Sequence, residues 1–94
     1  MSPSGTFAKV TPIEGTIVCN SADYLEMWSG GRFKSTMHRV VVPDTHVKAR
    51  QSIAYFIQPD NDVIVRCLDG SEKYPDTNVL QYYREQVEKT YHAQ

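Results

Sequence analysis

The sequence predicts a mainly β fold with helical additions, such as an antiparallel sandwich or a jelly roll, with an α-helix at its C-terminal end. Three observations favour this class. Short runs rich in β-branched and aromatic residues recur along the chain, clusters of Pro, Gly, Asn and Asp separate them, and the apolar residues take up a helical period only near the end. We therefore expect strands within residues 1–76 and, packed on them, a helix within residues 77–94.

Five runs have the composition and alternation of strands. Thr16, Ile17 and Val18, for example, are all β-branched, which favours an extended backbone. The predicted strands are residues 6–10, 15–20, 33–42, 50–58 and 63–68. Turn-forming and polar residues separate these runs. The predicted turns and loops are residues 11–14, 43–49, 59–61 and 69–76.

Two helices are predicted from capping residues and apolar spacing. A short helix begins near Ser21 or Asp23, either of which can cap it, and ends at the pair of glycines that starts with Gly30. Thr77 or Asn78 can cap the C-terminal helix. Its predicted apolar face consists of Val79, Leu80, Tyr83, Val87 and Tyr91.

The composition fits one small soluble domain or a part of a larger one. The 94 residues carry 10 basic and 11 acidic side chains, so the net charge of −1 gives no electrostatic reason to expect nucleic acid or an acidic membrane as partner. No apolar run approaches the ~20 residues of a spanning helix, and the first residues lack the pattern of a signal peptide. Cys19 and Cys67 lie in apolar runs and are predicted to be reduced core thiols, a single disulfide being the alternative. We expect a cytoplasmic protein.

One pocket is predicted from the spacing of three polar residues. If 33–42 and 50–58 are strands, a side-chain period of two lets His38 face the same interior as Arg50 and Ser52. An imidazole is a metal ligand, and an arginine fork with a neighbouring hydroxyl can hold a carboxylate. A lone strand histidine is more often a structural hydrogen-bonding group, so the joint spacing carries this prediction.

Three stretches together resemble a known family: TFAKVTPIEGTIVCNSAD, WSGGRFKSTMHRVVVP and RQSIAYFIQPD. They are similar to the C-terminal half of the Fe(II)- and 2-oxoglutarate-dependent dioxygenase domain, in its isopenicillin N synthase-like branch. The resemblance implies a partial double-stranded β-helix, or jelly roll. It implies His38 as an iron ligand, Arg50 and Ser52 as the groups that hold 2-oxoglutarate, and Phe56 as a residue that lines the pocket. Asn20 and Asp23 match a motif near the mouth of the barrel.

The activity implied by the resemblance is oxidation of a small molecule with Fe(II), 2-oxoglutarate and dioxygen, which yields succinate and carbon dioxide. The family's H-x-D pair of iron ligands is absent, because Val40, Lys48 and Gln94 stand two positions after the three histidines. One ligand does not hold iron well, so we expect a fragment that is inactive alone and does not retain its cofactors. Asp44 and His46 offer the same spacing in reverse, but they follow Pro43 in a predicted loop.

Two other functions stay open. A non-catalytic jelly-roll remnant could serve as a binding or oligomerisation module, and a weaker alternative is a fragment that binds a small carboxylate through Arg50. Missing strands would leave sheet edges unpaired, which predicts self-association. The sequence predicts neither the substrate nor whether the reaction is hydroxylation, desaturation or ring closure.

Overall fold

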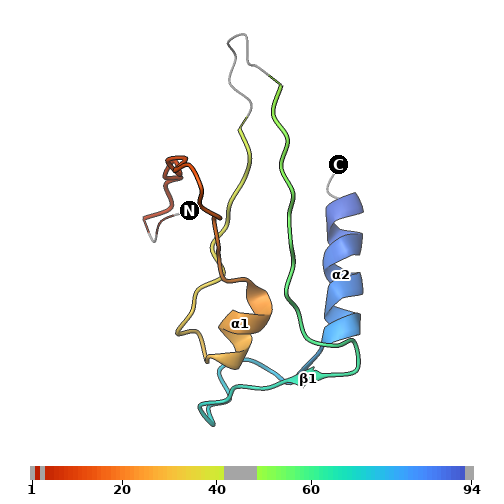
Figure 1. The fold of residues 1–94 in the computed structure, drawn as a ribbon. Helices are drawn as coiled ribbons and strands as arrows, with labels where there is room; N and C mark the ends of the chain where they lie inside the picture. The colour runs from red at the N-terminus through yellow and green to blue at the C-terminus, as the bar shows by residue number, and fades with distance from the viewer. Residues whose placement is uncertain (1, 3, 42–48, 93–94) are drawn as a thin grey trace.

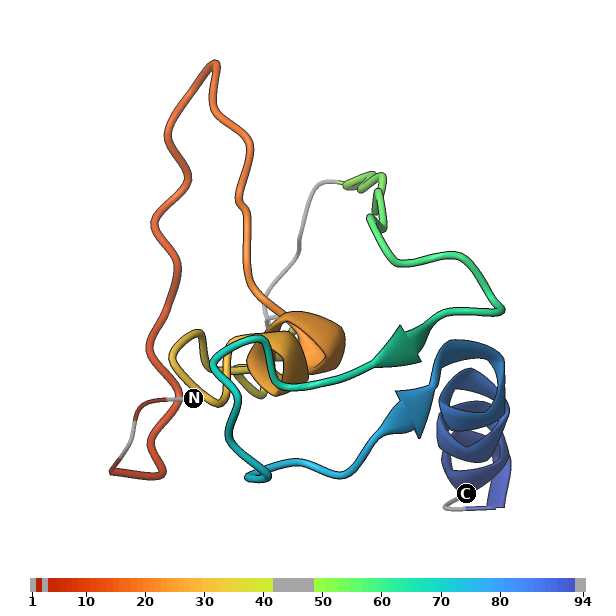
Figure 2. The same ribbon diagram turned by 90° about the horizontal axis from the view of Figure 1, so that it is seen from below.

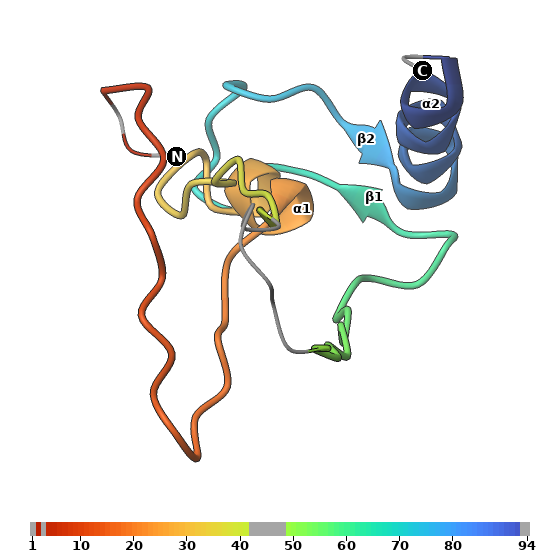
Figure 3. The same cartoon turned by 90° about the horizontal axis from the view of Figure 1, so that it is seen from above.

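A computed structural model describes residues 2, 4–41 and 49–92. Its elements are α1 (Asp23–Trp28), β1 (Ile64–Val65), β2 (Thr77–Asn78) and α2 (Val79–His92). β1 and β2 pair antiparallel, with Ile64 opposite Asn78 and Val65 opposite Thr77. Figures 2 and 3 show this two-stranded ribbon between α1 and α2. No helix in these ranges combines the length and the apolar character needed to cross a membrane. The predicted loop at 43–48 lies outside the described residues.

The predicted short helix forms as α1, but the prediction of its cap is wrong. The N-cap residue is Ala22, which makes no side-chain capping hydrogen bond. The Ser21 hydroxyl instead donates to the carbonyl oxygen of Lys34 at 2.8 Å. The helix ends where predicted, because Gly30 has a φ of 61°. This left-handed backbone conformation favours glycine, and a Cβ there would also meet the carboxylate of Asp69.

The C-terminal helix also forms, and Asn78 caps it as predicted. Its Oδ1 accepts a hydrogen bond from the backbone N–H of Gln81 at 3.0 Å. The predicted apolar face is wrong in part, because Tyr82 packs on the core while Tyr83 is 53% and Tyr91 75% exposed. The core reaches only the first turns of α2, so among the described residues Tyr83 and Tyr91 stay mostly exposed while Val87 is half-buried.

The core is small and joins all the elements near the base of the molecule. Its buried residues are Met27 from α1, Val65 from β1 and Val79 from α2. The partly buried residues around them are Tyr24, Trp28, Val63, Tyr74 and Tyr82. Cys19 is exposed and Cys67 half-buried, and both are free, so the prediction of a core thiol is wrong for Cys19.

Four predicted strands do not pair in the described residues: 6–10, 15–20, 33–41 and 50–58. Figure 1 shows the last two as long extended arms that rise away from α1 and β1. Of the fifth run, 63–68, Ile64–Val65 alone forms strand, with β2 as its unpredicted partner. A strand needs a hydrogen-bonded neighbour, and the described part of the chain supplies none for these four runs.

The dimensions of the chain show how much of it is uncovered. Its radius of gyration is 16.3 Å, against about 12 Å for a compact protein of this length. Its accessible surface is 9009 Å², against about 5,500 Å² for a compact monomer of this size. The excess of about 3,500 Å² includes large apolar side chains, such as Ile53 at 97% exposed. The arms therefore have the composition of buried strands but not the burial.

Candidate functional site

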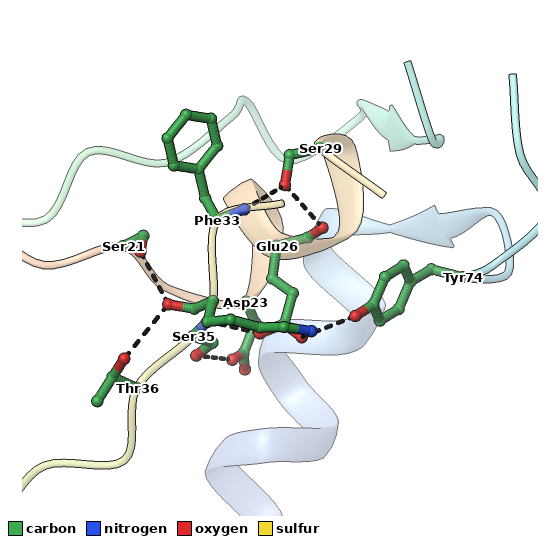
Figure 4. Close-up of polar contacts among 9 residues, drawn as sticks. Ser21, Asp23, Glu26, Ser29, Phe33, Ser35, Thr36 and Tyr74 are labelled. Carbon is green, nitrogen blue, oxygen red and sulfur yellow. Dashed lines mark hydrogen bonds and ion pairs between the residues drawn. The ribbon is translucent and has the colours of Figure 1, made fainter. Parts of the chain in front are cut away.

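The described site begins with two carboxylates on α1. Asp23 and Glu26 are three positions apart, so a helical period places them on the same face. That face is turned toward the arm 33–41, and Figure 4 shows both carboxylates reaching the same residue of that arm, Ser35. The Ser35 backbone N–H donates to Oε2 of Glu26, and its hydroxyl donates to Oδ1 of Asp23, both at 2.5 Å. These two hydrogen bonds hold the arm 33–41 in place at Ser35, three residues before His38.

Two tyrosines hold the other oxygens of these carboxylates. The Tyr74 hydroxyl donates to Oε1 of Glu26 at 2.7 Å, and the Tyr82 hydroxyl donates to Oδ2 of Asp23 at 2.7 Å. The ring of Tyr82 also meets that of Tyr24 edge to face, with centroids 5.6 Å apart. Each carboxylate therefore joins the His38 arm to the C-terminal part of the chain.

This network shifts the acidity of its members. The hydrogen bond from Tyr74, followed by the backbone hydrogen bond from Ser35, holds the pKa of Glu26 below its ordinary value. The hydrogen bond to Glu26 raises the pKa of Tyr74. Burial, followed by the hydrogen bond to Asp23, raises the pKa of Tyr82 well above its ordinary value. At neutral pH Tyr74 and Tyr82 therefore stay protonated, and their hydroxyls can donate to the carboxylate oxygens 2.7 Å away.

His38 lies at the edge of an open cavity of about 550 Å³ that the same residues line. The imidazole is exposed, and its Nδ1 lies 2.9 Å from the carbonyl oxygen of Thr36 and 3.3 Å from the side-chain nitrogen of Asn20. A carbonyl oxygen only accepts, so the closer contact requires a proton on Nδ1, and the Asn20 side-chain nitrogen, itself a donor, then makes no hydrogen bond to it. The lone pair of the neutral ring is then on Nε2, which is the form that binds a metal.

The described residues do not complete a metal site around His38. Within residues 4–41 and 49–92 no three His, Cys, Asp or Glu side chains are grouped so that they could hold a metal ion. Asp23 and Glu26 line the same cavity, and each of their carboxylate oxygens accepts a hydrogen bond from the protein. Asp44 and His46 lie outside the described residues. The donor set of this part of the chain therefore does not fit a three-ligand iron site.

The other predicted site residues stay apart from His38. Arg50, Ser52 and Phe56 are exposed on the arm 49–58, and none of them lines the cavity. The structure thus places the predicted metal ligand, His38, on one arm. It places Arg50 and Ser52, the predicted 2-oxoglutarate clamp, on the other.

The hydrogen-bond network around Ser35 was not predicted from the sequence. The spacing of Asp23 and Glu26 predicts that they share a face of α1, but not that they contact Ser35. The two tyrosines lie 48 and 59 residues from their carboxylate partners, and no local pattern marks such a contact.

We expect Ser35→Ala to destabilise the folded chain by about 1–2 kcal/mol, because it removes a donor from a half-buried carboxylate. Urea denaturation measures the loss, and hydrogen exchange should become faster in residues 33–38. Thr36→Ala is the matched control, since that hydroxyl is exposed and only 3.5 Å from a carbonyl oxygen. Equal effects of the two substitutions would show that the grip on Ser35 does not stabilise the arm.

Glu26 should make the folded state sensitive to acid. Because its pKa is lower in the folded chain than its ordinary value of 4.5, its contribution to stability is present above that value and is lost as the pH falls through the folded pKa. We expect Glu26→Gln to lower stability at pH 7 and to flatten the fall in the urea midpoint as the pH drops below the ordinary value of 4.5. Glu88→Gln removes an exposed α2 carboxylate as a control. An unchanged profile in Glu26→Gln would count against this linkage.

Comparison with known proteins agrees with the family resemblance seen in the sequence. Residues 1–59 match the family described as the 2OG-Fe(II) oxygenase superfamily. The chain is 39% identical over 66 residues to a homoarginine-6-hydroxylase of Glycine max, and the aligned segment covers 70% of this chain and 19% of that protein. It is 35% identical over 79 residues to the kihadalactone A synthase of Citrus sinensis, which covers 78% of this chain and 22% of that protein.

A third relative is a 2-oxoglutarate-dependent dioxygenase of Glarea lozoyensis, 34% identical over 104 residues, which covers 93% of this chain and 31% of that protein. The chain thus spans 19% to 31% of the length of these three relatives. No solved structure matches it.

Proposed function

The chain belongs to the 2OG-Fe(II) oxygenase superfamily, and on this premise we propose that it is the C-terminal part of a non-haem Fe(II)- and 2-oxoglutarate-dependent dioxygenase that oxidises a small molecule. The observation that carries the proposal is that the family match, residues 1–59, includes every predicted site residue. These residues are His38, Arg50, Ser52 and Phe56.

The fold that we propose follows from the family, which implies a jelly roll. In the complete domain the four unpaired runs become strands of a double-stranded β-helix, residues 1–76 form part of it, and the helix in 77–94 packs on it. The excess exposed surface of the chain, about 3,500 Å², supports this, because buried strands without their neighbours would leave such an excess. The two free cysteines accord with the cytoplasmic location that we propose.

The roles that we propose for the site residues follow from their chemistry. His38 supplies one imidazole to the iron through Nε2, Arg50 and Ser52 hold the distal carboxylate of 2-oxoglutarate, and Phe56 lines the pocket. The chain alone supplies one of the three ligands of a 2-His-1-carboxylate site, so we propose that it neither retains iron nor turns over by itself.

A second function has one observation in its favour. The exposed apolar arms would also suit a jelly-roll remnant that has lost its chemistry and acts as a binding or oligomerisation module.

One experiment separates the two functions. The reading frame upstream of Met1 is sequenced, and the polypeptide that it encodes together with this chain is assayed for succinate release with Fe(II) and 2-oxoglutarate. An in-frame H-x-D upstream and succinate release from the longer polypeptide are expected. A stop codon directly upstream, with no turnover, would favour the non-catalytic module.

A further inference from the structure

Two tyrosines of the C-terminal segment line the same cavity as His38, although they lie after the part of the chain that the family match covers. The Tyr74 hydroxyl donates to Glu26 and the Tyr82 hydroxyl donates to Asp23, each at 2.7 Å. The family match gives these hydroxyls no role. What they do therefore has to be found in the contacts that they make.

We propose that Tyr74 and Tyr82 are positioning residues for His38 and that they act on it through Ser35. The inference assigns the C-terminal segment a part in the candidate site. The placement of the imidazole follows from contacts within this chain, whereas its consequence for iron binding rests on the function proposed above.

The first step runs from the tyrosines to Ser35. A carboxylate turns easily about its last side-chain bond, because the torsion there is broad. Once the Tyr82 hydroxyl holds Oδ2 of Asp23, Oδ1 stays directed at the Ser35 hydroxyl. In the same way the Tyr74 hydroxyl holds Oε1 of Glu26, and Oε2 accepts the backbone N–H of Ser35 (Figure 4). Each tyrosine thus fixes one of the two acceptors that hold Ser35.

The second step runs from Ser35 to the imidazole through Thr36. Thr36 follows Ser35 directly, and its carbonyl oxygen lies 2.9 Å from Nδ1 of His38. In metal sites such a carbonyl commonly orients the ring and determines which ring nitrogen carries the proton. A displacement of Ser35 moves the Thr36 peptide with it. The contact with Nδ1 is then weakened, and the ring loses its orientation.

The protonated nitrogen of His38 is the direct readout, and the 94-residue chain itself can be used. Nitrogen NMR, at a pH where the ring is neutral, measures the ratio of the Nδ1–H form to the Nε2–H form. We expect Tyr74→Phe and Tyr82→Phe each to lower this ratio about two- to fivefold, the upper value being that for loss of one neutral hydrogen bond. Phenylalanine keeps the ring, so packing on the core is retained.

Tyr24→Phe is the matched control. The Tyr24 hydroxyl also joins α1 to the C-terminal part of the chain, but it donates at 3.0 Å to the backbone carbonyl oxygen of Val79 instead of to a carboxylate. We expect this variant to lose stability in urea denaturation and to keep the His38 ratio unchanged. A fall in the ratio as large as that in Tyr82→Phe would overturn the proposal, because the effect would then be one of general stability.

Double variants separate the two routes to Ser35. Ser35→Ala removes the hydroxyl that donates to Asp23 but keeps the backbone N–H that donates to Glu26. We therefore expect Tyr82→Phe to add nothing to the effect of Ser35→Ala, whereas Tyr74→Phe should lower the ratio further. Additive effects of Tyr82→Phe and Ser35→Ala would overturn the route through Asp23. The absence of any further effect of Tyr74→Phe would overturn the route through Glu26.

Anaerobic titration with Fe(II) gives a second readout, in the longer polypeptide described under the proposed function. We expect Tyr82→Phe to raise the Kd for Fe(II) about tenfold, as for loss of a group that supports a metal ligand, and Tyr24→Phe to leave it unchanged. If the unmodified polypeptide binds no Fe(II), the proposed function fails, and the His38 ratio in the 94-residue chain still decides the positioning role. If Tyr82→Phe binds Fe(II) as tightly as the unmodified polypeptide, the positioning role is overturned and the proposed function stands.

Discussion

Replacing His38 by alanine will lower 2-oxoglutarate turnover at least about 100-fold in the complete oxygenase to which we assign this chain. Loss of a group that only supports a metal ligand costs about 10–100-fold, and loss of the ligand itself should cost more. His38 is exposed and lines a cavity, and its Nδ1 is within hydrogen-bond distance of the Thr36 carbonyl oxygen, so its removal should leave the core intact. Succinate release and anaerobic retention of Fe(II) measure the effect.

His92→Ala is the control for this prediction, because His92 is the last residue of α2 and is exposed. We expect it to leave both turnover and iron retention unchanged. The 94-residue chain alone should release no succinate with or without His38. Turnover by the chain alone, or full iron retention in the longer polypeptide after His38→Ala, would show that the iron ligands lie elsewhere.

The sequence predicted the local elements better than the pairing. α1 and α2 form near their predicted positions, because a capping residue such as Asn78, a glycine stop at Gly30 and helical spacing are local signals. Strands depend on neighbours that can be far away in the sequence or in another part of the domain. The run 50–58 has every local mark of a strand, yet in the described structure it has no partner. The two-residue strand β2 has no such mark and forms because β1 lies beside it.

For the candidate site too, the sequence predicted individual residues but not the contacts between distant ones. The spacing of His38, Arg50 and Ser52, together with the family resemblance, predicted these residues, and their roles stay predictions because the structure leaves them on separate arms. The contacts that hold the His38 arm could not be predicted. They join Ser35 to Asp23 and Glu26 across 12 and 9 residues, and tertiary packing of α1 creates them.

The clamp is the part of the site for which the chain offers the sharpest set of variants. In the complete enzyme we expect Arg50→Ala to raise the KM for 2-oxoglutarate about 100-fold, because two charge-assisted hydrogen bonds of about 1.5 kcal/mol each are lost. Arg50→Lys keeps the charge but loses the planar guanidinium fork. Its KM for 2-oxoglutarate should therefore lie between that of the unmodified enzyme and that of Arg50→Ala. Ser52→Ala should raise the KM about fivefold, as expected for one neutral hydrogen bond.

The matched control for the clamp is Arg66→Ala. Arg66 is also an exposed arginine, but its Nε donates to Asp76 at 2.6 Å, on the loop before β2. Removing it should leave the KM for 2-oxoglutarate unchanged, because an exposed ion pair contributes little and lies away from the arm 49–58. If Arg50→Ala and Arg66→Ala change the KM alike, the effect is one of general charge, and the clamp must be sought in the part of the domain outside this chain.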